Sequence, residues 1–167
     1  FRSRDPRYSD ITLMMLGSGT PEMATSINEI IGDLKDRIIF PNKNFRQGGE
    51  LEKELVYSDF IILPSYREVF PLSAIEAAVR KIPLIITDLP VMKRFTQNDM
   101  VFGIANTGDP DSIRDAIDDV LMASKERIDT KVQNAFNYAS SLTWDYVATE
   151  TINHYEKLLS GHLPHVG

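Results

Sequence analysis

Short, continuously apolar runs alternate with longer amphipathic segments along most of the chain, and this alternation limits the fold more than any other feature. The apolar runs lie at residues 11–16, 37–40, 60–63, 84–87 and 101–105. Unbroken runs of this kind are typical of strands that are covered on both faces. Helices are expected between them, at residues 22–35, 50–57, 72–80 and 91–97. The alternation predicts an α/β protein with a doubly wound parallel sheet and helices on both faces.

Three further helices are expected after the last strand, because apolar residues recur there at helical spacing. The first stripe runs from Ile113 to Leu121, the second from Ile128 to Ala139, and the third from Trp144 to Leu159. We interpret all three stripes as packing surfaces, with Trp144 as an anchor in the core.

Composition indicates a single globular domain and argues against several classes of protein. The 167 residues suit one domain, and a hydrophobic content of 43% is enough to build a core. A net charge of −6 and a sequence pI near 5.0 argue against a dedicated nucleic-acid binder. No apolar run approaches the length needed to cross a bilayer. The absence of cysteine excludes disulfides and thiolate metal sites, and it fits a cytoplasmic location.

Two glutamates, Glu68 and Glu76, flank a junction between a strand and a helix. The stretch "SDFIILPSY" reads as a buried strand that enters a loop, and the next helix is expected to begin at Pro71. Proline is favoured in a first helical turn because its missing N–H is unpaired there anyway. One face of this helix is expected to enter the core through Leu72, Ile75 and Val79.

A nucleotide-sugar fits this junction chemically. The start of a helix presents free N–H groups and a partial positive charge, which favour a phosphate. A carboxylate accepts hydrogen bonds through two oxygens, so it can hold two adjacent hydroxyls of a sugar. Ligands of open parallel sheets also bind beyond the carboxyl ends of the strands. The alternative is that both glutamates are solvated or capping residues, since acidic residues near a helix start are favourable without a ligand.

The stretch "YSDFIILPSYREVFPLSAIEAAVRKIPLIITDLP" resembles the C-terminal, donor-binding domain of retaining GT-B glycosyltransferases, in the large family that includes sucrose synthase. The matching positions are Asp59, Pro64, Ser65, Glu68, Phe70, Leu72, Glu76, Ala77, Ala78 and Pro83. Upstream, "ITLMMLGSGTPE" resembles the family's second strand and glycine loop. Downstream, "TGDPDSIRDAIDDVL" and "SLTWDYVATETINHYEKLL" resemble its last helices. The resemblance covers nearly the whole chain and implies the Rossmann-like half of a GT-B fold.

The resemblance also implies an activity and a set of site residues. Glu68 would contact the donor sugar as the catalytic glutamate, and Glu76 would hold the ribose. Backbone N–H groups of Phe70 and Leu72 would contact the sugar and the diphosphate, and Asn44 would lie near the base. The full-length protein would transfer a sugar from its nucleoside diphosphate to an acceptor hydroxyl with retention of configuration, in polysaccharide biosynthesis for example. No metal and no cofactor besides the donor is expected.

The chain departs from the family pattern in three places. Pro71 and Ile82 stand where the family usually has glycine, and a proline has no N–H to offer the diphosphate. The family's first strand, which ends in glycine-arginine, and its lysine loop have no counterpart after Phe1. We therefore expect residues 1–167 to be a single donor-binding domain that lacks its first strand and an N-terminal acceptor domain. The isolated chain is expected to be inactive, and any membrane association would come through the missing part.

Other functions remain open at this point. A non-catalytic domain that binds a sugar-nucleotide, or an interaction module, is the main alternative to a transferase. A signalling receiver is disfavoured because its strands end in clustered aspartates, which this chain lacks. The "DPD" stretch at 109–111 has the form of a metal-binding motif, but it reads better as a helix start with Asp109 as the N-cap. The "GSG" at 17–19 is a weak phosphate signal.

Overall fold

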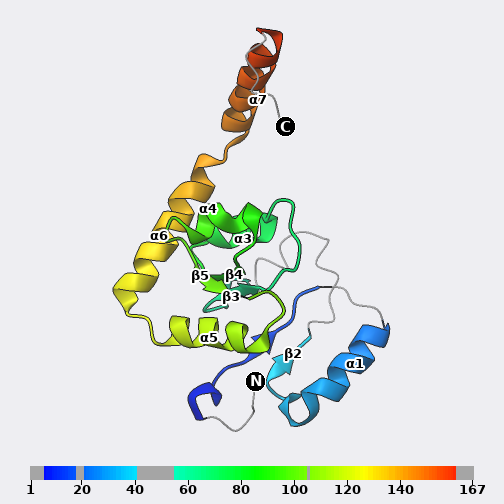
Figure 1. Ribbon diagram of the computed structural model, residues 1–167. Helices are drawn as coiled ribbons and strands as arrows, with labels where there is room; N and C mark the ends of the chain where they lie inside the picture. Colours follow the sequence, from blue (N-terminus) through cyan, green and yellow to red (C-terminus); the bar gives the residue numbers. More distant parts are fainter. Residues whose placement is uncertain (1–5, 18–20, 41–54, 105, 161–167) are drawn as a thin grey trace. The chain divides into compact units, whose positions relative to one another are not determined.

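The computed structural model describes residues 6–17, 21–40, 55–104 and 106–160 (Figure 1). The chain divides into two compact units, Phe1–Val56 and Tyr57–Gly167. Both contain parallel strands with helices between them, so the predicted α/β class is confirmed. That residues 1–167 form one donor-binding domain stays a prediction. Among the described residues, every helix is too short or too polar to span a bilayer.

The first unit is built on two short parallel strands. Its elements are η1 (Pro6–Tyr8), β1 (Leu13–Met14), α1 (Pro21–Ile31), η2 (Gly32–Leu34) and β2 (Ile38–Ile39). Leu13 pairs with Ile38. The side chain of Arg37 donates from Nε to the carbonyl of Ile11 at 3.2 Å and from its terminal nitrogen to the carbonyl of Tyr8. These bonds fasten the segment before β1 to the start of β2.

The second unit contains a three-stranded parallel sheet in the order β3-β4-β5. Its strands are β3 (Ile61–Leu63), β4 (Leu84–Thr87) and β5 (Phe102–Ile104). Its helices are α3 (Leu72–Val79), η3 (Pro90–Met92), α4 (Lys93–Thr96), α5 (Pro110–Leu121), α6 (Lys125–Ser141) and α7 (Trp144–Leu159). All five predicted strands are present among the described residues. Strand β4 fills its apolar run, and the other four strands are shorter than theirs. The helix predicted at residues 50–57 lies mostly outside the described residues.

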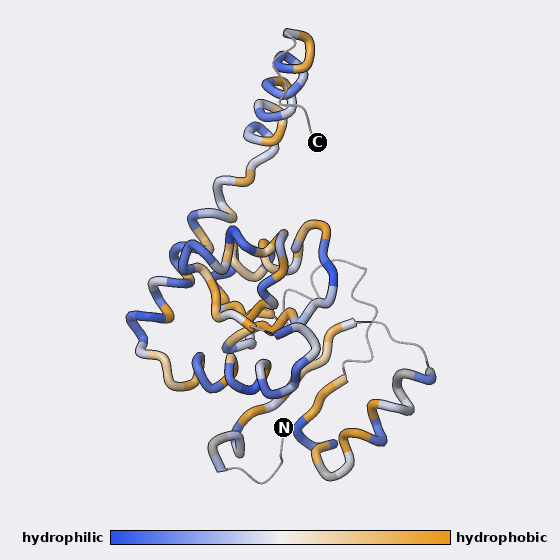
Figure 2. The backbone as a smooth tube through the Cα atoms, in the orientation of Figure 1, coloured by the Kyte–Doolittle hydropathy of each residue, from blue (hydrophilic) through white to orange (hydrophobic). Residues whose placement is uncertain are grey.

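The core of the second unit lies on its central strand. All four residues of β4 are buried, and the side chains of Phe102, Met92 and Phe95 are buried with them. Figure 2 shows the strands as apolar segments, whereas α5 and α6 carry many hydrophilic residues. Unbroken apolar character is needed in β4 because both of its faces and both of its edges are covered.

The buried face of α3 differs from the prediction. Leu72 and Val79 are exposed and Ile75 is only half-buried, so the expectation that these three enter the core is wrong. The buried residues are instead Ala74, Ala77 and Ala78. Helix α3 packs against α6, β3 and β4. Small side chains allow the backbones to approach closely, and interiors at native density leave no room for larger ones at such a contact.

Two of the three C-terminal stripes pack as predicted. The second unit buries Ala116, Ile117 and Val120 from α5, and Ala135 and Ala139 from α6. Helix α7 contributes no buried residue, and Trp144 is 87% exposed. The interpretation of Trp144 as a core anchor is therefore wrong. An aromatic residue at helical spacing marks a potential packing face, but packing also needs a neighbouring surface within the unit.

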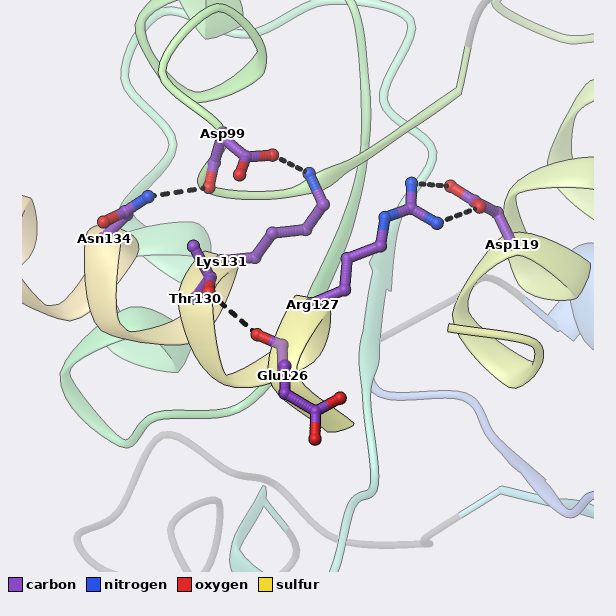
Figure 3. A network of polar contacts seen from close by, with 7 residues as sticks. All are labelled: Asp99, Asp119, Glu126, Arg127, Thr130, Lys131 and Asn134. Atoms are coloured by element: carbon purple, nitrogen blue, oxygen red, sulfur yellow. Dashed lines mark hydrogen bonds and ion pairs between the residues drawn. The ribbon is translucent and has the colours of Figure 1, made fainter. Parts of the chain in front are cut away.

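Helix α6 is held in place by a network of ion pairs (Figure 3). Arg127 pairs with both oxygens of Asp119 at the end of α5, at 2.5 and 2.9 Å. Lys131 pairs with the carboxylate of Asp99, and Asn134 donates to the Asp99 carbonyl at 3.2 Å. The guanidinium of Arg127 and the ammonium of Lys131 each lie 5.2 Å from the centre of the Phe102 ring. The network therefore joins α6 to α5, to the turn before β5 and to β5 itself.

Candidate functional site

The predicted site lies at the carboxyl edge of the sheet in the second unit. Because β3, β4 and β5 are parallel, the segments that follow them leave from the same edge. The segment after β3, residues 64–71, carries Glu68 and leads into α3, which carries Glu76. Both glutamates are exposed. Parallel sheets bind ligands at this edge, because the loops and the helix starts meet there.

Glu68 is oriented by a neighbour in its own loop. The hydroxyl of Ser65 donates to Oε1 of Glu68 at 3.1 Å. This bond limits the directions in which the carboxylate can point, while Oε2 stays available for another donor. Ser65 belongs to the sequence motif, but sequence reasoning gave it no role. The signal was its position three residues before Glu68, which allows a local side-chain bond within a turn.

Pro71 closes a tight turn at the start of α3. Its φ of −82° and ψ of 71° are those of an inverse γ-turn, and the N–H of Leu72 donates to the Phe70 carbonyl at 2.9 Å. The helix therefore begins at Leu72, with Pro71 at the N-cap rather than at the first helical position. The Leu72 N–H, predicted to contact the diphosphate, already has a partner in this structure. It becomes available to a ligand only when the turn opens.

The rest of the helix start is ordered by the same proline. The N–H groups of Ala74 and Ile75 both donate to the Pro71 carbonyl, at 3.0 and 3.1 Å. Glu76 follows in the second turn of α3, and its main-chain carbonyl accepts a bond from the Arg80 guanidinium at 2.7 Å. The side chains of Phe70 and Leu72 are exposed. Four of the five predicted site residues thus lie within one loop and one helix, and Asn44 lies outside the described residues.

Asp88 follows β4 at the same edge, and sequence reasoning missed it. Its carboxylate accepts a bond from Lys93 Nζ at 2.6 Å and one from the Thr96 hydroxyl at 2.8 Å. These hydrogen bonds, that of Lys93 foremost, hold the pKa of the Asp88 carboxyl below its usual value. Through these two bonds, Asp88 fastens α4 to the carboxyl end of β4. In the sequence, the signal for this role is that Asp88 is the first charged residue after the buried strand.

Replacement of Asp88 by asparagine is expected to change how the free energy of unfolding depends on pH in the acid range. A lowered folded-state pKa adds stability that is complete above the unfolded value, near pH 4, and is lost as the pH falls through the folded value. The difference in unfolding free energy between wild type and Asp88→Asn should be constant above about pH 5 and vanish at lower pH. Chemical denaturation at a series of pH values measures it. A difference that persists unchanged to about pH 2 would contradict the role of the Asp88 charge.

The "DPD" stretch is a helix start, as predicted. Asp109 is the N-cap of α5, and its side chain accepts from the Asp111 N–H at 3.0 Å, with Pro110 in the first turn. Asp111 pairs with Arg114 at 2.7 Å. Within the part of the chain that the structure describes, no three histidine, aspartate or glutamate residues are grouped so that they could hold a metal ion.

Comparisons with known proteins agree with the fold. A family model described as "Glycosyl transferases group 1" matches residues 2–123, which is most of the chain. No relative among curated proteins matches the chain. A solved sucrose-phosphate synthase from Thermosynechococcus elongatus is similar over 90% of this chain, with a TM-score of 0.71 and 21% identity. The C-terminal domain of a glycosyl transferase group 1 family protein from Francisella tularensis is similar over 81%, with a TM-score of 0.68 and 20% identity.

This chain covers different shares of the two solved structures. The chain spans 39% of the sucrose-phosphate synthase and 71% of the Francisella domain. At these identities the likeness concerns the fold alone.

Proposed function

Because the chain belongs to the group 1 glycosyl transferase family, we propose that it binds the nucleoside-diphosphate sugar of a glycosyltransferase. Within the full-length protein the sugar passes to an acceptor hydroxyl with retention of configuration. The acceptor side comes from a part of the protein outside these residues. The match to only 39% of the sucrose-phosphate synthase chain supports this division.

One observation carries the proposal. The two exposed carboxylates, Glu68 and Glu76, stand on either side of the start of α3, at the edge of the sheet where ligands of such folds bind. The bond from Ser65 limits the orientations of the Glu68 carboxylate, which lowers the cost of ordering it around a sugar. The proposal assigns Glu76 to the ribose hydroxyls and Glu68 to the transferred sugar.

In the proposed reaction, Glu68, Glu76 and the start of α3 bind the donor and stabilise charge. The bond between the anomeric carbon and the diphosphate oxygen breaks, the acceptor oxygen bonds to the same face, and the hydroxyl proton leaves with the diphosphate. The Glu68 carboxylate would stabilise the positive charge that develops at the anomeric carbon. The start of α3 would face the diphosphate, and the γ-turn at Pro71 would open to release the Leu72 N–H.

Glu76→Gln tests the ribose assignment. Glutamine keeps the size of the side chain but replaces one acceptor by a donor and removes the charge. We expect a loss of roughly 1.5–3 kcal/mol in binding of nucleoside diphosphates, the scale of a hydrogen bond to a charged group. Calorimetric titration of the full-length protein measures it. Glu156→Gln, the same change at an exposed site on α7, serves as the control and should bind as wild type does.

Glu68→Gln is expected to behave differently in the same titration. It should weaken binding of the intact donor and leave binding of the bare diphosphate unchanged. Equal affinities for wild type and Glu76→Gln would remove the ribose assignment. Donor binding without any transfer by the full-length protein would favour the non-catalytic module instead.

A further inference from the structure

Tyr66 rests on a glycine that is distant in the sequence. A Cβ atom added at Gly108 would lie 2.8 Å from both Cε1 and Oη of Tyr66, and 3.1 Å from its Cζ. These separations are below van der Waals contact, so a side chain at position 108 would displace the exposed end of the Tyr66 ring. Gly108 also has a φ of +78°, a conformation that glycine adopts freely and other residues adopt at a cost. The tyrosine ring and the glycine backbone are therefore in direct contact.

The contact spans the carboxyl edge of the sheet. Tyr66 follows β3 and Gly108 follows β5, and β4 lies between these two strands. Neighbouring strands are about 4.8 Å apart, so the ends of β3 and β5 are separated by about 10 Å. The long side chain of Tyr66 bridges this gap and joins the two segments over the end of the central strand.

The segment that carries Gly108 is ordered by hydrogen bonds to the start of α5. The N–H of Asn106 donates to the Ser112 hydroxyl at 3.0 Å, and the N–H of Asp109 donates to the Asn106 carbonyl at 3.3 Å. The Asp109 cap joins this turn to the first turn of α5. Tyr66 itself is 72% exposed, so its contact with Gly108 buries too little of the ring to count as core packing.

We propose that Tyr66, seated on Gly108, is a positioning residue that holds the Ser65–Glu68 segment in the geometry needed to receive the donor sugar. Ser65 and Glu68 lie one residue before and two residues after Tyr66, and the hydroxyl of Ser65 is bonded to the Glu68 carboxylate. A ring anchored on the far side of β4 thus fixes the backbone from which this pair projects. The inference rests on the proposed function where it concerns the sugar, whereas the anchoring concerns the loop alone.

Gly108→Ala and Tyr66→Ala remove the contact from its two sides. Gly108→Ala displaces the ring from the glycine, and Tyr66→Ala removes the ring. Tyr66→Phe keeps the ring and removes only the hydroxyl. Gly32→Ala is the matched control, because Gly32 also has a positive φ, of +49°, but nothing lies within 4 Å of an added Cβ. It reports the cost of backbone strain without a collision.

Hydrogen exchange of residues 64–75 in the full-length protein is the first readout, because this range includes the hydrogen-bonded N–H groups of Leu72, Ala74 and Ile75. We expect exchange of this segment to rise by about threefold or more in Gly108→Ala and in Tyr66→Ala. Exchange should be unchanged in Tyr66→Phe and in Gly32→Ala. The double variant should match Tyr66→Ala, because Gly108→Ala has no ring to displace once Tyr66 is replaced. Tyr66→Ala changes an exposed side chain, so it keeps the test decisive if Gly108→Ala does not fold.

Calorimetric titration is the second readout, with UDP-glucose, ADP-glucose, GDP-mannose and the three bare diphosphates as probes. Both contact-breaking variants should bind the preferred donor about tenfold more weakly and its bare diphosphate within about twofold of wild type. Unchanged exchange in both variants would overturn the inference, and so would equal losses for donor and diphosphate. A wild-type protein that binds none of the probes would refute the proposed function, while the exchange data would still decide whether Tyr66 anchors the loop.

Discussion

Ile86→Ala is expected to lower the free energy of unfolding by about 3 kcal/mol, within the range for removing a buried isoleucine side chain. Ile86 is 0% exposed and lies on the central strand, where it pairs with Leu63 of β3 and Gly103 of β5. Its neighbours on both sides are fixed by the sheet, so the cavity left by the deleted carbons cannot collapse. Chemical denaturation measures the change as a lower midpoint at constant slope.

Ile30→Ala supplies the control for this prediction. The chemical change is identical, but Ile30 is 82% exposed on α1, so the free energy of unfolding should change by less than about 0.5 kcal/mol. Equal effects of the two substitutions would show that β4 is not the centre of the core. A change in slope for Ile86→Ala would indicate an altered denatured state or a loss of two-state unfolding.

Asp99→Asn is expected to cost about 1–2 kcal/mol of folding stability at neutral pH, less than the loss of a fully buried ion pair, because the side chain of Asp99 is 61% exposed. The side chain of Lys131 is only 10% exposed, and its ammonium pairs with the Asp99 carboxylate (Figure 3). Asparagine still accepts a hydrogen bond but leaves the buried charge unbalanced. The φ of +50° at residue 99 is tolerated by asparagine as well as by aspartate, so backbone strain does not enter.

The matched control is Asp129→Asn, which removes the partner of Lys125 on the surface of the same helix. Both side chains of that pair are well exposed, and exposed pairs one helical turn apart contribute about 0.3–0.5 kcal/mol. Thermal and chemical unfolding of the two variants should therefore differ clearly. If Asp99→Asn costs no more than Asp129→Asn, then Lys131 finds solvent or another partner, and the network does not hold α6.

The parallel strands were predictable because their signal is local. Each of the five unbroken apolar runs contains a strand, although among the described strands only β4 is buried along its whole length. The N-cap at Asp109 was predictable for the same reason, since an aspartate, a proline and a second aspartate act on the backbone next to them. The segment of Glu68 and Glu76 was found through its motif, and the roles of these two residues stay predictions.

The buried face of α3 could not be read from the sequence. Leucine, isoleucine and valine are more hydrophobic than alanine, so a pattern of hydrophobicity selects the wrong face. The alanines are buried because another helix, α6, lies against them, and this proximity exists only in the folded unit. Trp144 also could not be placed from the sequence. Its apolar stripe has helical spacing, but α7 has no buried residue and Trp144 is 87% exposed.

The sequence by itself determined the class of fold, the order of the elements and the segment that carries the two glutamates, because periodicity, capping and motifs act between residues close along the chain. Only the tertiary structure decided that the turn at Pro71 engages the Leu72 N–H, that Asp99 neutralises Lys131, and that Tyr66 rests on Gly108. The last two contacts join residues separated by 32 and by 42 positions (131 − 99 and 108 − 66). Contacts at such separations depend on strand order and helix placement, which the chain acquires only when it folds.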